Sequence, residues 1–128
     1  MGGRLATLKI RADFLRVAAT RRKAVTPGLI LQAAPQPGLA ADAAPRVGFT
    51  ASRKVGNAVI RNRAKRRLRV AAAEILPVRG KSGTDYVLIA RSGTAERPYP
   101  ALLDDLAGAL RKIERSPGRP RPRPAEED

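Results

Sequence analysis

The sequence predicts one α+β domain, a two-layer sandwich whose elements follow the order α-β-β-β-α-β-α and whose sheet has four strands. Three observations lead to this class. Apolar residues recur at helical spacing in three segments, and short apolar runs bounded by Gly and Pro lie between them. The 128 residues suffice for one domain with a modest core. We expect the domain at residues 10–115, between a mobile N-terminus at 1–9 and a disordered tail at 116–128.

The first elements are a short helix and two strand pieces. Four apolar residues recur at helical spacing: Ile10, Phe14, Val17 and Ala18. They predict a helix at 10–19. Residues 21–35 indicate two strand pieces broken at Pro27, because proline cannot donate to the ladder of a central strand. An Ala-, Pro- and Gly-rich loop at 35–45 leads to a strand at 46–52, in which apolar residues alternate with small and polar ones.

A long helix is expected from residue 57 to about 76. Asn57 can cap its first turn, and Pro77 is expected to end it. The apolar residues that fall within roughly 80° of one another on the helix are Ile60, Ala64, Leu68, Ala71 and Ile75. The opposite side carries Asn62, Lys65, Arg66 and Arg69, with Arg61 and Arg63 on its flanks. One face should therefore pack on the sheet while the other meets solvent or a ligand.

The last elements are a strand and an amphipathic helix. Residues 85–90 (DYVLIA) form the most apolar strand of the chain. The segment from Tyr99 to Ile113 has leucines at helical spacing and predicts a helix. From Ser116 the tail SPGRPRPRPAEED cannot build a core, and its Arg-Pro repeats are typical of a disordered, partly polyproline segment.

The charge of the chain indicates a polyanionic partner. Lys and Arg total 26 against 11 acidic residues, which gives a formal net charge of +15. A compact body with this charge repels itself, so a nucleic acid is the expected partner and a membrane surface is less favoured. The chain has no Cys, and no stretch approaches the roughly 20 apolar residues of a membrane span. We therefore expect a cytoplasmic protein.

The basic residues concentrate in one block at 46–69. Nine of its residues are Arg or Lys, and none is acidic. A solvated helix face usually mixes charges of both signs, because like charges at i,i+4 destabilise a helix. Here Arg61, Lys65 and Arg69 place like charges at that spacing. The pattern favours contact with RNA over a solvated face.

The block RVGFTASRKVGNAVIRNRAKRRLR resembles the signature of the protein subunit of bacterial ribonuclease P. Its centre is similar to that family's defining run: Arg61-Asn62-Arg63, followed by Lys65-Arg66 and Arg69. Residues 11–14 (RADF) resemble the family's first helix, and residues 85–91 (DYVLIAR) resemble the strand after the basic helix. The resemblance covers roughly residues 8–115.

The resemblance implies a subunit that binds the catalytic RNA and helps hold precursor tRNA while the holoenzyme removes the 5′ leader. Magnesium, held mainly by the RNA, would support this endonucleolytic hydrolysis, and the protein would bind no cofactor tightly. The strand at 46–52, the helix at 57–76 and the strand at 85–90 would form a left-handed crossover, as in a ribosomal-protein-like fold. Handedness statistics alone favour the right-handed form about 98 times in 100.

Two RNA-binding surfaces follow from the resemblance. The catalytic RNA would contact Arg53, Lys54, Asn57, Arg61, Asn62, Arg63, Lys65, Arg66 and Arg69. The leader would lie in a cleft between the first helix and the sheet, at Arg11, Phe14, Arg46 and outward-facing sheet residues. Many relatives carry a second aromatic where this chain has Ala18, so leader binding should rely on backbone electrostatics and Phe14. From the residues alone Phe14 suits the core, and both interpretations stay open.

The sequence offers no nuclease site of its own. It has no His, the commonest general base. The closest internal carboxylates, Asp104 and Asp105, are neighbours that point about 100° apart on a helix. A two-metal site needs carboxylates that converge from different elements. We therefore predict no catalytic residue and no metal ligand in this chain.

Two other functions stay open at this point. A structural ribosomal protein or a basic RNA chaperone, without an enzymatic partner, would have a similar composition. Binding of double-stranded DNA by the basic helix would need a helix-turn-helix pairing or a dimer element, and the sequence indicates neither. The ordered signature block and the concentration of charge in the folded region favour a ribonuclease P subunit, with no membrane or DNA partner.

Overall fold

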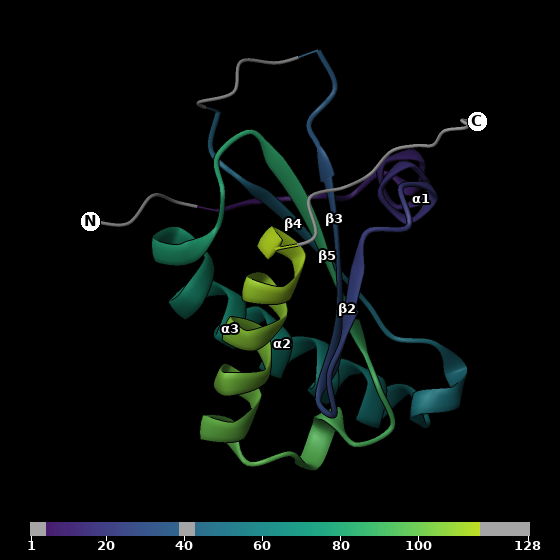
Figure 1. The fold of residues 1–128 in the computed structure, drawn as a ribbon. Coiled ribbons are helices and arrows are strands. Elements are labelled where there is room, and N and C mark those ends of the chain that lie inside the picture. The colour runs from purple at the N-terminus through teal and green to yellow at the C-terminus, as the bar shows by residue number, and fades with distance from the viewer. Residues whose placement is uncertain (1–4, 39–42, 116–128) are drawn as a thin grey trace, which may run out of the picture.

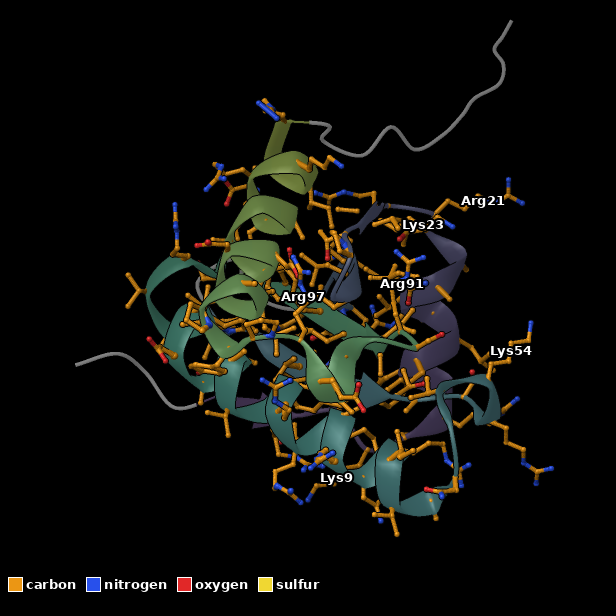
Figure 2. The ribbon with its side chains drawn as sticks, turned by 90° about the horizontal axis from the view of Figure 1, so that it is seen from below. Lys9, Arg21, Lys23, Lys54, Arg91 and Arg97 are labelled. Atoms are coloured by element: carbon orange, nitrogen blue, oxygen red, sulfur yellow. The ribbon has the colours of Figure 1, made fainter. Side chains whose placement is uncertain are left out.

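The computed structural model describes residues 5–38 and 43–115, and the expected tail at 116–128 lies outside these ranges. The described residues form a single α+β domain with a five-stranded sheet (Figure 1). The sheet and the pair of helices α2 and α3 make the two main layers that the sequence predicts. Helix α1 lies on the other side of the sheet from α3, as the view from below shows (Figure 2).

Every helix and strand that the sequence predicts is present. In chain order the elements are β1 (Ala6–Thr7), α1 (Arg11–Ala19), β2 (Lys23–Val25), β3 (Leu29–Pro35), β4 (Arg46–Thr50), η1 (Arg53–Val55), α2 (Ala58–Arg79), β5 (Thr84–Ala90), η2 (Thr94–Glu96) and α3 (Tyr99–Arg115). The strand order across the sheet is β1-β4-β5-β3-β2. Strand β4 is parallel to β1 and β5, whereas β3 is antiparallel to β5 and β2. The β4–α2–β5 crossover is therefore present, and its left-handed sense stays a prediction.

The sheet has five strands, and the prediction of four was wrong. The additional strand, β1, pairs with the outer edge of β4 and lies within the segment 1–9 that we expected to be mobile. The Leu8 N–H donates to the Val47 carbonyl at 2.8 Å, and the Leu8 side chain is buried. A two-residue strand has no sequence period of its own, so it depends on the free edge of β4 and the burial of Leu8. The element order begins with a strand, and residues 6 and 7 belong to the sheet.

Helix α2 begins where predicted and ends later than predicted. The Asn57 side chain accepts a hydrogen bond at 3.0 Å from the backbone N–H three residues on, so Asn57 is the N-cap. Pro77 does not end the helix, which continues to Arg79. A proline in the last turn removes only one N–H donor, and the Gly80 N–H closes the helix on the Leu76 carbonyl at 2.8 Å.

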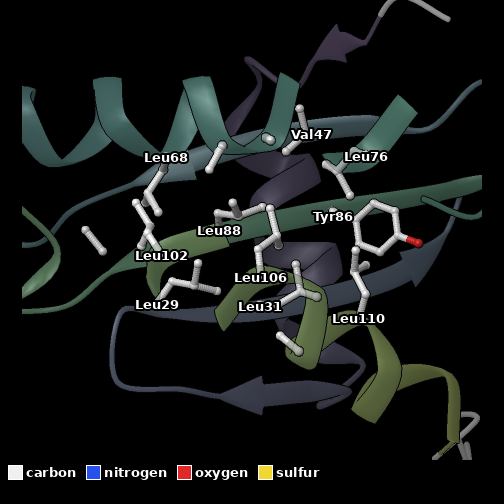
Figure 3. Close-up of a cluster of buried hydrophobic side chains, with 14 of the residues drawn as sticks. Leu29, Leu31, Val47, Leu68, Leu76, Tyr86, Leu88, Leu102, Leu106 and Leu110 are labelled. Atoms are coloured by element: carbon white, nitrogen blue, oxygen red, sulfur yellow. The ribbon is translucent and has the colours of Figure 1, made fainter. Parts of the chain in front are cut away.

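The main apolar core lies between the sheet and the α2–α3 pair (Figure 3). The predicted apolar face of α2 is confirmed, because Ala64, Leu68 and Ala71 are fully buried. Ile60 and Ile75 are half-buried at the ends of that face. The sheet and α3 contribute the large residues Leu29, Leu31, Tyr86, Leu88, Leu102, Leu106 and Leu110. Since one face of α2 is held on this core, the basic residues on the opposite side of the helix face away from it.

A second, smaller apolar cluster lies between α1 and the sheet. Its buried residues are Leu8, Val17, Ala34 and Val87. Of the predicted apolar residues of the first helix, only Val17 is buried. Ile10 is the N-cap and stays 64% exposed, and Ala18 is also exposed. The nine residues of α1 make about two and a half turns, and this short helix meets the sheet along one side with only Val17 fully buried.

Phe14 is half-buried and lies on Gly48 of β4. A Cβ atom at Gly48 would be 2.5 Å from Cζ and 2.7 Å from Cε2 of the Phe14 ring. Gly48 is therefore a close-packing glycine, which lets the ring approach the backbone of the strand. The ring packs on the smaller cluster and keeps part of its surface exposed. Phe14 therefore covers the sheet without being fully buried, and its contact with the leader stays a prediction.

We expect Gly48→Ala to destabilise the fold by about 1–3 kcal/mol, because the new methyl group overlaps the Phe14 ring and must displace it. Gly93→Ala is the matched control. A Cβ atom at Gly93 has no neighbour within 4 Å, so the free energy of unfolding should change by less than about 0.5 kcal/mol. Urea denaturation measures both values, and equally small effects would contradict the close packing of α1 on β4.

Candidate nucleic-acid interface

The residues predicted to contact the catalytic RNA occupy the turn before α2 and the outward side of that helix. Seven of the nine are exposed: Arg53, Lys54, Asn57, Asn62, Arg63, Arg66 and Arg69. The other two, Arg61 and Lys65, are half-buried. Gly56 has a φ of +149°, a conformation that favours glycine, and it turns the chain from η1 into α2. The structure thus brings the predicted set onto one side of α2 and the adjoining turn, which we call the α2 surface.

The cations of the α2 surface form no salt bridge within residues 5–38 and 43–115. The cations that form salt bridges in those ranges are Arg16, Arg46 and Arg97. Two cations of the α2 surface make other contacts. Arg61 donates to the Gly56 carbonyl at 3.0 Å, and the Arg69 guanidinium lies over the Phe49 ring, 5.5 Å from its centroid. The α2 surface therefore keeps its positive charge uncompensated by the carboxylates of the described chain.

Arg67 shows a different use of a basic residue on the same helix. Its guanidinium donates to the carbonyl of Thr94, a fully buried residue of η2, at 2.7 Å. The Thr94 hydroxyl in turn donates to the Gly28 carbonyl at 2.7 Å. Arg67 therefore ties α2 to two loops at one end of the sheet, and it is a structural residue within the basic block.

The residues predicted to bind the leader have different environments. Arg11 is exposed in the first turn of α1, and Phe14 is half-buried beside it. Arg46 donates from Nε and Nη2 to the two carboxylate oxygens of Asp85, at 2.8 and 2.7 Å. Arg46 therefore belongs to an ion-pair network, a role that its position in the basic block did not indicate.

Asp85 is the centre of this network. Its side chain is 0% exposed, and Arg16 of α1 donates to the same carboxylate. Burial raises the pKa of Asp85, but the hydrogen bonds from Arg46 and Arg16 outweigh it and hold the pKa below its ordinary value of 3.8. The hydrogen bond to Asp85 also raises the pKa of Arg46. Asp85 and Arg46 are therefore both charged at neutral pH.

The sheet beside α1 carries a row of residues that the sequence did not single out. Strand register aligns Thr50, Ile89, Ile30 and Val25 across β4, β5, β3 and β2. Thr50 and Ile89 lie two residues beyond Gly48 and Val87, which α1 covers. Because side chains alternate along a strand, the row is on the face that carries α1. Three are half-buried, and Val25 is 44% exposed. Alternation indicated which residues share a face, but the register that aligns four strands depends on the tertiary structure.

Basic side chains lie on the same side of the molecule as this row (Figure 2). Arg21, Lys23 and Arg91 project on the side of the molecule that carries α1, and Lys54 follows them toward the turn before α2 (Figure 2). Arg21, Lys23 and Arg91 are exposed, and the Arg91 guanidinium donates to the Thr26 carbonyl at 2.7 Å. A chain of phosphates could therefore pass along the row with cations close by.

Comparison with known proteins identifies the family. The family model for ribonuclease P matches residues 3–114 of the chain. The chain belongs to the ribonuclease P protein family. The matched residues include the α2 surface and the row beside α1. Family membership does not favour the alternative of a ribosomal protein or an RNA chaperone.

Relatives and solved structures agree with this assignment. The ribonuclease P protein component of Paramagnetospirillum magneticum is 60% identical over 114 residues, which cover 88% of this chain and 86% of that protein. The corresponding protein of Ruegeria pomeroyi is 53% identical over 110 residues, covering 85% and 86%. The RNase P protein of Staphylococcus aureus has a TM-score of 0.69 at 22% identity, covering 87% of this chain and 97% of that one. The RNase P protein of Thermotoga maritima has a TM-score of 0.68 at 23% identity, covering 83% and 96%. The structural likeness supports the fold, and the sequence likeness supports the assignment as a ribonuclease P protein component.

The described part of the chain has neither a membrane-crossing helix nor a metal-binding cluster. None of its helices combines the length and the apolar character that crossing a membrane requires. The same residues contain no group of three or more His, Cys, Asp or Glu side chains that could hold a metal ion.

We expect Asp85→Asn to destabilise the fold by about 2–4 kcal/mol, because it leaves Arg16 and Arg46 without their buried carboxylate. The folded-state pKa of Asp85 lies below its unfolded value. The contribution of ionised Asp85 to the free energy of unfolding is therefore fully present above about pH 4. It is lost as the pH falls through the lowered pKa of the folded state.

Denaturation at a series of pH values measures both effects. The Asp85→Asn protein should lose this part of the acid dependence. Asp104→Asn removes an exposed carboxylate of α3 and is the control, with little expected change. If Asp85→Asn were as stable as the wild type at neutral pH, the network would have no role in holding α1.

Proposed function

We propose that the chain binds the catalytic RNA of ribonuclease P along the α2 surface and holds the 5′ leader of precursor tRNA beside α1. It thereby assists the endonucleolytic removal of the leader that produces the mature 5′ end. The proposal rests on the difference between cations that form salt bridges and cations that do not. Within the described ranges the salt bridges use Arg16, Arg46 and Arg97, whereas the α2 surface has none. Cations kept out of ion pairs remain available to neutralise phosphates.

The α2 surface suits contact with an RNA backbone. Its exposed arginines supply charge together with several donors, and each phosphate that they neutralise releases counterions. Asn62 lies among them and can donate to a phosphate or sugar oxygen. The side-chain oxygen of Asn57 is used by the helix cap, but its amide group remains available as a donor. We therefore expect this surface to recognise mainly the path of the backbone.

The leader is proposed to lie along the row beside α1. The Phe14 ring lies on Gly48, two residues before Thr50 on β4, so it stands near the β4 end of the row. Thr50, Ile30 and Val25 have no aromatic ring, so a base cannot stack on them as it can on Phe14. We therefore expect leader binding to depend on phosphate contacts and on one stacking position, with little base preference.

Arg11 and Arg46 complete the proposed leader site. Arg11 is exposed at the start of α1 and can reach a phosphate. A direct contact between Arg46 and the leader stays a prediction. Two nitrogen atoms of Arg46 already donate to Asp85, and its side chain is 30% exposed. In either case Arg46 supports the site, because it helps to hold the carboxylate that anchors α1.

The hydrolysis is proposed to take place on the RNA, with Mg²⁺ held mainly by RNA phosphates. The buried carboxylates Asp85 and Asp105 already accept hydrogen bonds from arginines, so they are poor candidates for metal ligands. The protein's own part is to bind and position its two RNA partners. A cytoplasmic location is proposed on the basis of this partnership.

Arg63→Ala and Arg66→Ala should weaken binding of the catalytic RNA and leave the fold intact, because both side chains are exposed. Each should reduce the slope of log affinity against log salt by about 1, because each variant leaves one phosphate without its arginine. Lys112→Ala on α3 removes the same charge and is the control. Filter binding at several salt concentrations and thermal melting measure the two properties. A lower melting temperature with unchanged RNA affinity would identify Arg63 and Arg66 as structural residues.

Phe14→Ala should weaken binding of precursor tRNA to the holoenzyme by about 1–3 kcal/mol, because it removes the one ring on which a leader base can stack. Mature tRNA, which lacks the leader, should bind nearly as before. Phe14→Leu keeps an apolar cover on Gly48 without an aromatic ring, so it separates stacking from packing. Equilibrium binding to the reconstituted holoenzyme measures these affinities. Equal losses for precursor and mature tRNA would assign Phe14 to the core alone.

A further inference from the structure

A groove of about 320 Å³ lies between the C-terminal half of α2 and the β1–β4 edge of the sheet. It is lined by Leu5, Thr7, Val47, Phe49, Arg69, Ala73 and Pro77. The lining is mainly apolar, and among the described residues Arg69 is its one charged side chain. Because Arg69 also belongs to the α2 surface, the groove continues directly from the proposed RNA-binding side of the helix.

Phe49 and Arg69 determine the chemistry of this groove. Phe49 is half-buried, and it packs against the main core from β4. The Arg69 guanidinium lies over the ring and forms no hydrogen bond with residues 5–38 or 43–115. A guanidinium on an aromatic ring is flat, positively charged and rich in donors. Such a pair can contact the face of a base and still donate to its edge or to its phosphate.

We propose that the groove binds one unpaired nucleobase of the catalytic RNA. The inference rests on the proposed function, because the same RNA must lie along the α2 surface. The base enters against Phe49, between Ala73 and Pro77 of α2 and the Leu5 side of the strand edge. Arg69 stands at the rim and donates to the base or to its phosphate.

The shape and charge of the groove favour this occupant. A paired base has both faces stacked, so a duplex presents phosphates, sugars and base edges to a side groove but no free base face. An unpaired nucleotide combines a flat apolar face with a negative charge, which matches an apolar lining with one arginine at its rim. The groove would therefore recognise a single-stranded position, whereas the rest of the α2 surface contacts phosphates.

A fluorescent reporter can test this proposal, because the chain has no Trp. Phe49→Trp places a single indole in the groove. Val78→Trp is the matched control, since Val78 is 79% exposed on the last turn of α2 and does not line the groove. Saturating catalytic RNA should quench the emission of the Phe49→Trp protein and change that of the Val78→Trp protein little. A fully paired RNA duplex, bound at low salt, should leave both emissions unchanged.

Affinity measurements provide a second readout. Phe49→Leu keeps an apolar side chain and removes the ring, so it should weaken binding of the catalytic RNA by about 5- to 100-fold. The salt slope should not change, because every cation that neutralises a phosphate is still present. Phe49→Tyr keeps the ring and should bind nearly as the wild type does. Circular dichroism and thermal melting establish that the variants are folded.

Two results would overturn the proposal. One is unchanged emission from the Phe49→Trp protein when it is saturated with catalytic RNA. The other is equal quenching by the catalytic RNA and by the duplex, since that would indicate approach of a backbone and not of an unpaired base. The proposed function would fail in a different way, namely if Arg63→Ala and Arg66→Ala left both affinity and salt slope unchanged.

Discussion

The buried carboxylate of Asp85 holds α1 against the sheet, and the leader side of the domain depends on that placement. Arg46 of β4 and Arg16 of α1 donate to this one group on the central strand β5. Arg16 also donates to the Pro35 carbonyl of β3 at 2.9 Å, so one side chain links the helix to two strands. A buried carboxylate without partners would cost several kcal/mol, and the two arginines offset that cost. Because hydrogen bonds are directional, they set the position of α1 more narrowly than the small apolar cluster beneath it could.

The geometry of the proposed leader site follows from this anchor. With α1 held in place, the Phe14 ring rests on the bare backbone of Gly48 and stays partly exposed. Beside the ring, the row that crosses the sheet from Thr50 of β4 to Val25 of β2 stays partly exposed. The single aromatic ring and the aliphatic row give this side of the protein few means of distinguishing bases. Phosphate contacts therefore have to supply most of the binding.

Two acidic residues are buried and paired inside the domain, and among the described residues no carboxylate pairs with the α2 surface. Asp85 and Asp105 are buried and pair with Arg46, Arg16 and Arg97. The α2 surface thus concentrates positive charge where the helix faces outward. Self-repulsion among those cations opposes folding of the free protein, and binding of a polyanion would relieve it. Charge on this helix is therefore better explained by a partner than by stability.

Local signals were enough to locate α2, its cap at Asn57 and its basic side, because capping and helical period act between residues a few positions apart. The family signature, also a local pattern, predicted the α2 surface. Long-range contacts were not predictable in the same way. The partner of Arg46 lies 39 positions along the chain, so its ion pair with Asp85 exists only once β4 and β5 are neighbours. For the same reason the contact of Arg67 with Thr94, 27 positions along the chain, could not be predicted, although Arg67 was not among the outward residues of its helix. Strand β1 could not be recognised before the free edge of β4 existed to pair with it. Periodicity determines which residues share a face, whereas folding determines what each face meets.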